Sequence, residues 1–203
     1  MRCFIVGNGP SLGLTNLNKL IGEVSFATNN IHLIYDKTEW RPAHYVRAEE
    51  ANTDTNADTW KPSIDIHKEL CCEMWCNHMF AAGGHEIIPC THYRRHYNDT
   101  DCPALWHLPI LCGFGSSVNV AIQIAHTLGY SPIYLVGCDL GKDMDHFDEK
   151  YRHGGEQENK YANLDALQAH IIASRMGIDI RNATVGGELE VYKRVEYASL
   201  FDR

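Results

Sequence analysis

Short apolar runs alternate along the chain with segments in which apolar residues recur three or four positions apart. Short runs are typical of buried strands, and the wider spacing is typical of amphipathic helices. The predicted strands are residues 4–6, 24–28, 44–48, 85–90, 132–136 and 178–180. The predicted helices are residues 14–21, 63–78, 118–128 and 164–176.

The order of these elements predicts an α/β fold in which helices flank a parallel sheet. The helix at 118–128 and the strand at 132–136 have the order of a right-handed crossover unit. A chain of 203 residues is long enough for one sizeable core. We therefore expect a single domain over residues 1–203, with an insertion at about 51–112 and an active-site loop at about 140–161.

The composition is that of a globular protein, with 44% hydrophobic and 22% charged residues. The formal net charge of -8 argues against a nucleic-acid partner, because phosphate backbones attract clusters of Lys and Arg. Apolar runs fall short of the roughly 20 residues that a membrane-spanning helix needs, and the start of the chain lacks the pattern of a signal peptide. We therefore expect a cytoplasmic protein without a transmembrane segment. The oligomeric state, including a homo-oligomer, stays open.

The first strand ends in a turn of small residues, Gly7-Asn8-Gly9-Pro10-Ser11. Glycines let the chain turn sharply and let backbone approach a ligand closely, and Pro10 suits a first helical turn. Free amides at the start of a helix, together with the Ser11 hydroxyl, form an anion site. The turn therefore predicts a loop that binds a phosphate or a nucleotide, although an ordinary strand-to-helix turn can have the same residues.

Further polar residues stand next to other predicted elements. Asn29 follows the second strand, Ser116 and Ser117 begin the helix that contains residues 118–128, and Asp139 follows the strand at 132–136. Because open parallel sheets bind ligands at the carboxyl ends of their strands, Asn29 should lie beside the glycine turn. The amide of Asn29 can recognise a base or a ribose, or it can be a plain turn residue.

The hydrophilic segment after Asp139 contains His146 and His153. Histidine titrates near neutral pH, so either residue can act as a general base or donate to a developing phosphate charge. Two glycines beside His153 would let the segment close over a ligand. The alternative is that both histidines are solvated loop residues.

Cysteine and histidine are concentrated in the middle of the chain. Structural zinc sites pair their ligands two to four residues apart and repeat the pair after a gap. Cys72, Cys76 and His78, and Cys90 with His92, come near this spacing. We expect buried thiols and solvated histidines and no metal site, and the zinc alternative stays open.

Four features of the sequence match the pattern of one superfamily: the glycine turn, Asn29, Gly115-Ser116-Ser117 and Leu128-Gly129-Tyr130-x-x-Ile133-Tyr134-Leu135-x-Gly137-x-Asp139. By these features the chain resembles the superfamily that contains the family 42 bacterial sialyltransferases and the Rossmann-like proteins related to archaeal 6-hydroxymethylpterin diphosphokinase, together with many bacterial and phage proteins. The resemblance covers residues 3–48 and 113–182 and implies a Rossmann-like (GT-A-like) parallel sheet.

The resemblance also implies roles for individual residues. His146 falls where a tyrosine of the sialyltransferases steadies the departing phosphate, and His153 is the counterpart of their histidine base. Such enzymes need no metal cofactor, and the nucleotide sugar is their substrate. Five positions match those that hold the CMP part of the donor: Asn8, Gly9, Ser11, Asn29 and Ser117.

Three functions agree with these observations. The main hypothesis is a glycosyltransferase that moves a sugar from a CMP-sialic-acid-type donor to a hydroxyl acceptor such as a glycan, with His153 as the base. The second is an ATP-dependent pyrophosphokinase that uses Mg²⁺ held by Asp139 and loop carboxylates. The third is a nucleotide-binding module without catalysis.

Overall fold

The structure is a computed structural model of the chain. It describes residues 1–48, 57–77, 84–89, 110–111, 116–141, 146–151, 166–167 and 169–202. Within these ranges, every helix is too short or too polar to cross a membrane.

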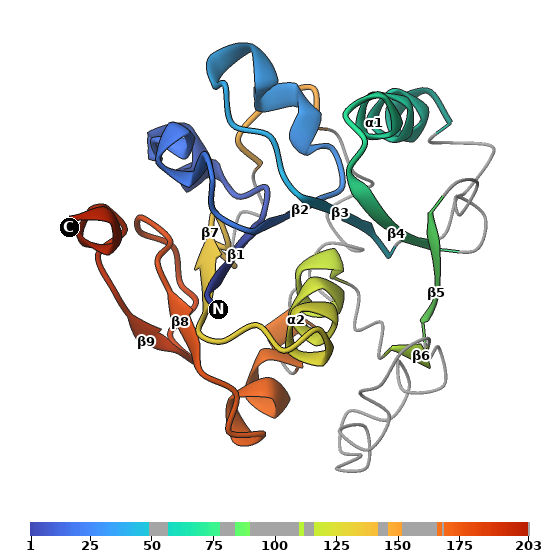
Figure 1. Ribbon diagram of the computed structural model, residues 1–203. Coiled ribbons are helices and arrows are strands. Elements are labelled where there is room, and N and C mark those ends of the chain that lie inside the picture. Colours follow the sequence, from blue (N-terminus) through green and yellow to red (C-terminus); the bar gives the residue numbers. More distant parts are fainter. Residues whose placement is uncertain are drawn as a thin grey trace.

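The described strands form one parallel sheet with the order β6-β5-β4-β3-β2-β1-β7-β8-β9 (Figure 1). β1 is central, and its Ile5 lies opposite Phe26 of β2 and Leu135 of β7. The predicted α/β fold with a parallel sheet is confirmed. The strands are β1 (Cys3–Val6), β2 (Ser25–Thr28), β3 (His44–Arg47), β4 (Glu73–Asn77), β5 (His85–Pro89), β6 (Ile110–Leu111), β7 (Ile133–Val136), β8 (Ile180–Asn182) and β9 (Lys193–Arg194).

Helices cover both faces of the sheet (Figure 1). Side chains alternate along β1, so Phe4 and Val6 pack on one face while Cys3 and Ile5 pack on the other. The first face is covered by the 3-10 helices η1 (Pro10–Leu14), η2 (Leu17–Leu20) and η3 (Ile31–Lys37), by α1 (Ala57–Glu69) and by η7 (Ala198–Phe201). The second face is covered by α2 (Ser117–Thr127) and by the helical residues 166–167 and 169–175.

The helix predicted at 63–78 is wrong in its second half. α1 ends at Glu69, and Glu73–Asn77 form β4. Met74 and Trp75 are buried on opposite faces of the sheet, so this strand is apolar on both sides. Such a run lacks the alternation of a half-buried strand, which is why its apolar spacing resembled that of a helix.

Smaller differences lie at the two ends of the chain and in its middle. The helix predicted at 14–21 is the pair of short helices η1 and η2, and the strand predicted at 178–180 lies at Ile180–Asn182. β6 and β9 were not predicted, because strands of two residues leave no periodic pattern. The described parts of the predicted insertion, 51–112, add α1, β4, β5 and β6 to the same fold. The extent of the domain stays a prediction.

Candidate functional site

Loops from both halves of the sheet meet at the carboxyl end of β1. β2 and β3 lie on one side of β1, whereas β7 and β8 lie on the other, so the strand order reverses there. Ligands of open parallel sheets bind in the crevice at such a reversal. We therefore call this region the candidate site: the glycine turn after β1, the ends of β2, β3 and β7, and the start of α2.

The glycine turn packs against the loop that follows β7. The amide of Gly7 donates to the carbonyl oxygen of Val136, and that of Gly9 to the carbonyl oxygen of Gly137, both at 2.8 Å. A Cβ atom at Gly7 would lie 2.6 Å from the Gly137 oxygen, and one at Gly9 would overlap the carboxylate of Asp139. The glycines therefore allow two loops of the protein to touch, and their contact with a ligand stays a prediction.

Ser11 binds Asp139 through two hydrogen bonds. Its hydroxyl donates to Oδ2 at 2.8 Å, and its backbone amide also donates to the carboxylate. Burial raises the pKa of Asp139 above its ordinary value, and the bonds from Ser11 oppose this rise. The sequence predicted that this helix start would bind the anion of a ligand, whereas in the structure Ser11 binds the carboxylate of Asp139. η1 is a 3-10 helix of five residues, and its first turn holds the protein's own carboxylate.

Asn8 is buried, with its side-chain amide turned toward the end of β2. Nδ2 donates to the carbonyl oxygen and to Oγ1 of Thr28, both at 2.9 Å. Because the carbonyl oxygen only accepts, these contacts identify which end of the amide is nitrogen. Oδ1 is buried and has no hydrogen-bond partner among the described residues. An unpaired buried acceptor costs about 1–3 kcal/mol, so a donor group of a ligand would relieve this cost.

Asn29 and Ser117 are brought together in the structure. The Ser117 hydroxyl donates to Oδ1 of Asn29 at 2.7 Å and accepts from the amide of Ala48 at 3.1 Å. Asn29 has a φ of 51°, a left-handed conformation that asparagine adopts more readily than most residues. Ser116 lies at the N-cap of α2 without a side-chain cap bond. The start of α2 is thereby tied to β2 and β3.

Arg47 lies at the same edge, although it is not among the predicted site residues. It ends β3, is 3% exposed, and donates from Nη1 to Oδ1 of Asn30 at 3.2 Å. Burial and, to a lesser extent, the charge of Arg47 lower the pKa of His32. An arginine at the end of an apolar strand is the signal that sequence reasoning could have used. Its guanidinium gives the candidate site a positive charge that the glycine turn does not supply.

The described segment 146–151 lies against the glycine turn. The amide of Phe147 donates to the carbonyl oxygen of Asn8 at 3.1 Å. Beside it, the His146 ring stacks on Tyr151, with ring centroids 3.8 Å apart, and Tyr151 is 5% exposed. His146 thus belongs to a segment that contacts the candidate site. His153 lies outside the described residues.

The described cysteines and histidines of the middle segment do not form a metal centre. His67 and Cys76 are buried, whereas Cys71 is exposed. His85 lies 2.9 Å from Glu73, which also contacts His44. Across the described ranges, no group of three or more His, Cys, Asp or Glu side chains could hold a metal ion. Cys72 is half-buried, and three other residues of this segment named above lie outside those ranges: His78, Cys90 and His92.

No protein-family model and no curated protein sequence matches the chain. Among solved structures, the chain is similar to the MAf glycosyltransferase from Magnetospirillum magneticum AMB-1, with a TM-score of 0.64 and 17% sequence identity. The likeness covers 98% of this chain and 34% of that protein, so the chain spans about a third of its length. At this identity the likeness shows a shared fold. The resemblance to sialyltransferases and pterin diphosphokinases stays a prediction.

Proposed function

We propose that the protein is a glycosyltransferase that uses a nucleotide-activated sugar and transfers it to a hydroxyl acceptor. Two findings support this proposal: the fold shared with the MAf glycosyltransferase, and the group of polar residues at the point where the strand order reverses. A donor of the CMP-sialic-acid type is the finer form of the proposal. It rests on the sequence resemblance, and so does a glycan as the acceptor.

The unpaired Oδ1 of Asn8 is the observation that carries the proposal. The other amide atom of Asn8 is held by Thr28, so the orientation of the side chain is fixed before a ligand arrives. Oδ1 then accepts a hydrogen bond from an amino or hydroxyl group of the nucleotide. Cytosine has an exocyclic amine and ribose has hydroxyls, and both classes of donor suit a lone acceptor.

The chemistry needs one base and a positive environment for the leaving group. In the proposed reaction, His153 takes the proton of the acceptor hydroxyl, the new glycosidic bond forms, and the bond from the sugar to the nucleotide phosphate breaks. His146 and Arg47 stabilise the departing phosphate. We assign this role to side chains because the amides of Gly7 and Gly9 donate within the protein. No metal is required by this scheme.

Nucleotide binding to the Asn8→Ala variant tests the proposal. Thermal unfolding is measured with CMP, UMP and ATP, each with and without Mg²⁺. We expect CMP to stabilise the wild-type protein without Mg²⁺, because a ligand at a hundred times its Kd adds about 2.7 kcal/mol to the free energy of unfolding. Asn8→Ala should lose most of this stabilisation.

Asn119→Ala is the matched control. Asn119 is also a buried asparagine with an unpaired Oδ1, but its Nδ2 donates to the carbonyl oxygen of Ala166 in the last helix. This variant should lose stability without losing the response to CMP. If the protein were stabilised only by ATP together with Mg²⁺, and not by CMP, the result would contradict the proposal and favour a pyrophosphokinase. Binding of CMP without turnover of any donor sugar would favour a binding module.

A further inference from the structure

Asn29, directly after β2, has an uncommon backbone conformation. Its φ of 51° lies in the left-handed region, which is less favourable than the right-handed region for a residue with a Cβ atom. Such conformations persist where the surrounding structure holds them, and they are concentrated at sites of binding and catalysis. The contacts that hold Asn29 therefore bear on the candidate site.

The carbonyl oxygen of Asn29 is held by two buried hydroxyls. The hydroxyl of Tyr45 donates to it at 2.8 Å, and the hydroxyl of Ser63 donates to it at 2.7 Å. Both side chains are 0% exposed. Burial raises the pKa of Tyr45 to about 12, against smaller opposing effects of Arg47 and Ser63. The Tyr45 hydroxyl therefore keeps the hydrogen that it donates.

These two hydroxyls also contact each other, with their oxygen atoms 3.1 Å apart. Each hydroxyl has one hydrogen, so two hydrogens serve the contacts among the three oxygen atoms. Because the contact between the hydroxyls holds one hydrogen at most, at least one hydrogen always points to the carbonyl of Asn29. Loss of one hydroxyl thus leaves the carbonyl with a donor, whereas loss of Tyr45 and Ser63 hydroxyls together removes both donors.

Other atoms of Asn29 are tied to other elements. Its backbone amide donates to the carbonyl oxygen of Val46 in β3 at 3.2 Å, and its Oδ1 accepts from the hydroxyl of Ser117 in α2 at 2.7 Å. Ser63 belongs to α1 on the first face of the sheet, and α2 lies on the second face (Figure 1). The φ and ψ angles of Asn29 set the directions of its carbonyl and its side chain together, so the hydroxyls that fix the carbonyl also fix the approach to Ser117.

We propose that Tyr45 and Ser63 are positioning residues for the nucleotide. They hold the backbone of Asn29 in the left-handed conformation, and this places the Asn29 side chain beside Ser117 in the candidate site. The two hydroxyls act through Asn29, since both are buried and donate within the protein. This proposal rests on the proposed function, in which a nucleotide binds at the candidate site.

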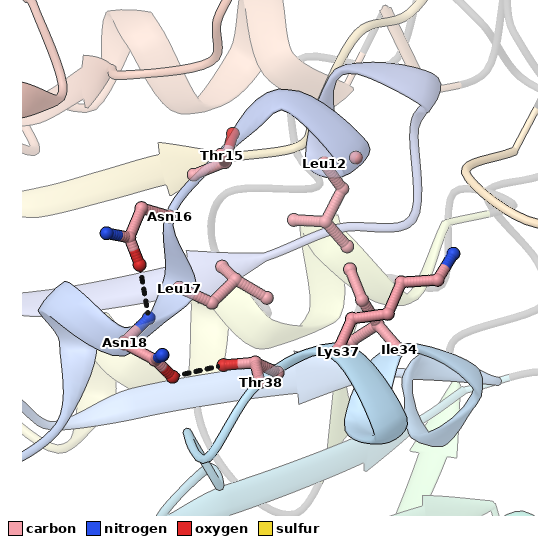
Figure 2. Close-up of a pocket in the computed structure, with 9 residues that line it drawn as sticks. Leu12, Thr15, Asn16, Leu17, Asn18, Ile34, Lys37 and Thr38 are labelled. Carbon is pink, nitrogen blue, oxygen red and sulfur yellow. Dashed lines mark hydrogen bonds between the residues drawn. The ribbon is translucent and has the colours of Figure 1, made fainter.

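The helical layer on the first face also contains a small pocket, between η1, η2 and η3 (Figure 2). Its volume is about 110 Å³, whereas pockets for small-molecule ligands typically have roughly 300–1,000 Å³. Beside it, Oδ1 of Asn18 accepts from Oγ1 of Thr38 at 2.6 Å. Its lining residues do not include Asn29, Tyr45 or Ser63. We therefore expect the nucleotide to bind at Asn29 and not in this pocket.

NMR titration of the ¹⁵N-labelled protein with CMP tests the proposal. The wild type is compared with Tyr45→Phe, Ser63→Ala and the double variant. We expect CMP to shift the amides of residues 29, 48 and 117 and not those of residues 15–18 and 38 at the pocket. Each single variant should raise the Kd for CMP by about threefold or less, because one donor remains. The double variant should raise it by about thirtyfold, which exceeds the product of the single effects, as expected within one hydrogen-bond network.

The conformation of Asn29 is measured in the same samples without a ligand. The NOE between its own amide and α hydrogens is strong at positive φ, and it should weaken in the double variant. Hydroxyls with a purely structural role would lower the unfolding free energy and leave both this NOE and the Kd for CMP unchanged.

Ser25→Ala and Tyr192→Phe are the matched controls. Ser25 is a buried serine at the start of β2, and its hydroxyl accepts from Nε1 of Trp40 at 3.0 Å. Tyr192 is a buried tyrosine whose hydroxyl donates to the carbonyl oxygen of His170 at 3.2 Å. Neither residue belongs to the candidate site. Singly and together, these substitutions should lower the unfolding free energy and leave the Kd for CMP unchanged.

The dispersion of the amide spectrum shows whether each variant is folded. If the double variant does not fold, Ser63→Cys replaces Ser63→Ala in the comparison, because a thiol fills the space of the hydroxyl and is only a weak donor.

Three results would overturn the positioning role. They are effects of Tyr45→Phe and Ser63→Ala that merely multiply, an unchanged Asn29 NOE in the folded double variant, and equal weakening of CMP binding by the control double variant. Failure of the wild type to bind CMP, UMP or ATP would contradict the proposed function itself, and the nucleotide role of Asn29 with it. When the wild type binds CMP, any of the three results contradicts only the role of Tyr45 and Ser63.

Discussion

Two buried histidines should make the protein sensitive to acid. His67 is 0% exposed, and its ring stacks on Tyr45 with centroids 3.9 Å apart. Nδ1 lies 2.6 Å from the carbonyl oxygen of Ser63, and Nε2 lies 2.7 Å from the hydroxyl of Tyr35. Because a carbonyl only accepts, Nδ1 carries the hydrogen and Nε2 accepts from Tyr35. The neutral imidazole thus satisfies both neighbours.

Burial is the main reason why the pKa values of these histidines are low. It lowers the pKa of His67 from 6.5 to about 4, against a smaller opposing effect of the Ser63 carbonyl. It lowers the pKa of His170 from 6.5 to about 3, and Nδ1 of His170 lies 3.0 Å from the hydroxyl of Tyr192. Both side chains stay neutral in the folded protein at a pH where the unfolded chain binds protons.

The sign and size of the effect follow from this difference. Below pH 6.5 the unfolded state takes up a proton at each histidine and the folded state does not, so stability falls as the pH falls, until the folded pKa is reached. Each pH unit in this window lowers the unfolding free energy by about 1.36 kcal/mol per histidine. A fall from pH 6.5 to pH 5 therefore lowers it by about 2 kcal/mol for each histidine. The two together cost about 4 kcal/mol, out of the roughly 5–15 kcal/mol typical of a folded domain.

Urea unfolding at pH 7 and pH 5 measures this loss. His67→Gln and His170→Gln each replace a titrating ring with an amide that does not titrate. We expect each variant to reduce the difference in unfolding free energy between the two pH values by about 2 kcal/mol. A constant cost of the substitution cancels in that difference.

The double variant is the control for independence. His67 contacts residues on the first face of the sheet, and Tyr192, the partner of His170, packs on the second. Effects of such separated sites usually add, so the double variant should remove about 4 kcal/mol of the difference. If either single variant kept the full pH dependence of the wild type, the assignment of that histidine as buried and neutral would be refuted.

Two further predictions concern the glycine turn and the thiols. Gly9→Ala should lower the unfolding free energy by about 1–3 kcal/mol, because the new methyl group meets Asp139. In the control Gly13→Ala the methyl group faces open space, so the unfolding free energy should change by less than about 0.5 kcal/mol. Equal effects of the two substitutions would contradict the close packing of Gly9 against Asp139. In native protein, iodoacetamide should label the exposed Cys71 before the buried thiols, whose pKa burial raises to about 12. Mass spectrometry of tryptic peptides identifies the order of labelling. The buried thiols are Cys3, Cys76 and Cys138, and early labelling of any of them would be inconsistent with the structure.

The sequence pattern predicted five of the described strands well. β1, β2, β3, β5 and β7 are short apolar runs next to glycine or polar turns, and such local signals survive in the fold. The structure also joins Asn29 to Ser117, 88 positions apart in sequence, by a hydrogen bond. The strand-end rule placed Asn29 at this edge, whereas Ser117 was linked to it only through the resemblance.

Pairings between distant residues could not be predicted in the same way. That Ser11 binds Asp139, or that Asn8 binds Thr28, depends on the exact approach of loops that the sequence does not encode locally. Arg47 was overlooked because an arginine is usually exposed, and its position at the end of an apolar strand was not read as a sign of burial. The error at Met74 and Trp75 has another cause, since a strand buried on both faces lacks a period of two.

The pairing of Ser11 with Asp139 bears on which nucleotide the candidate site suits. Loops that cradle a triphosphate do so with a series of free backbone amides and a lysine. Here the amides of Gly7, Gly9 and Ser11 donate within the protein, so a triphosphate would have to displace the Asp139 carboxylate. Recognition of a nucleoside through the side chain of Asn8, with a single phosphate near Arg47, needs no such displacement. For the proposed function, a nucleoside monophosphate sugar therefore suits the candidate site better than ATP as the substrate.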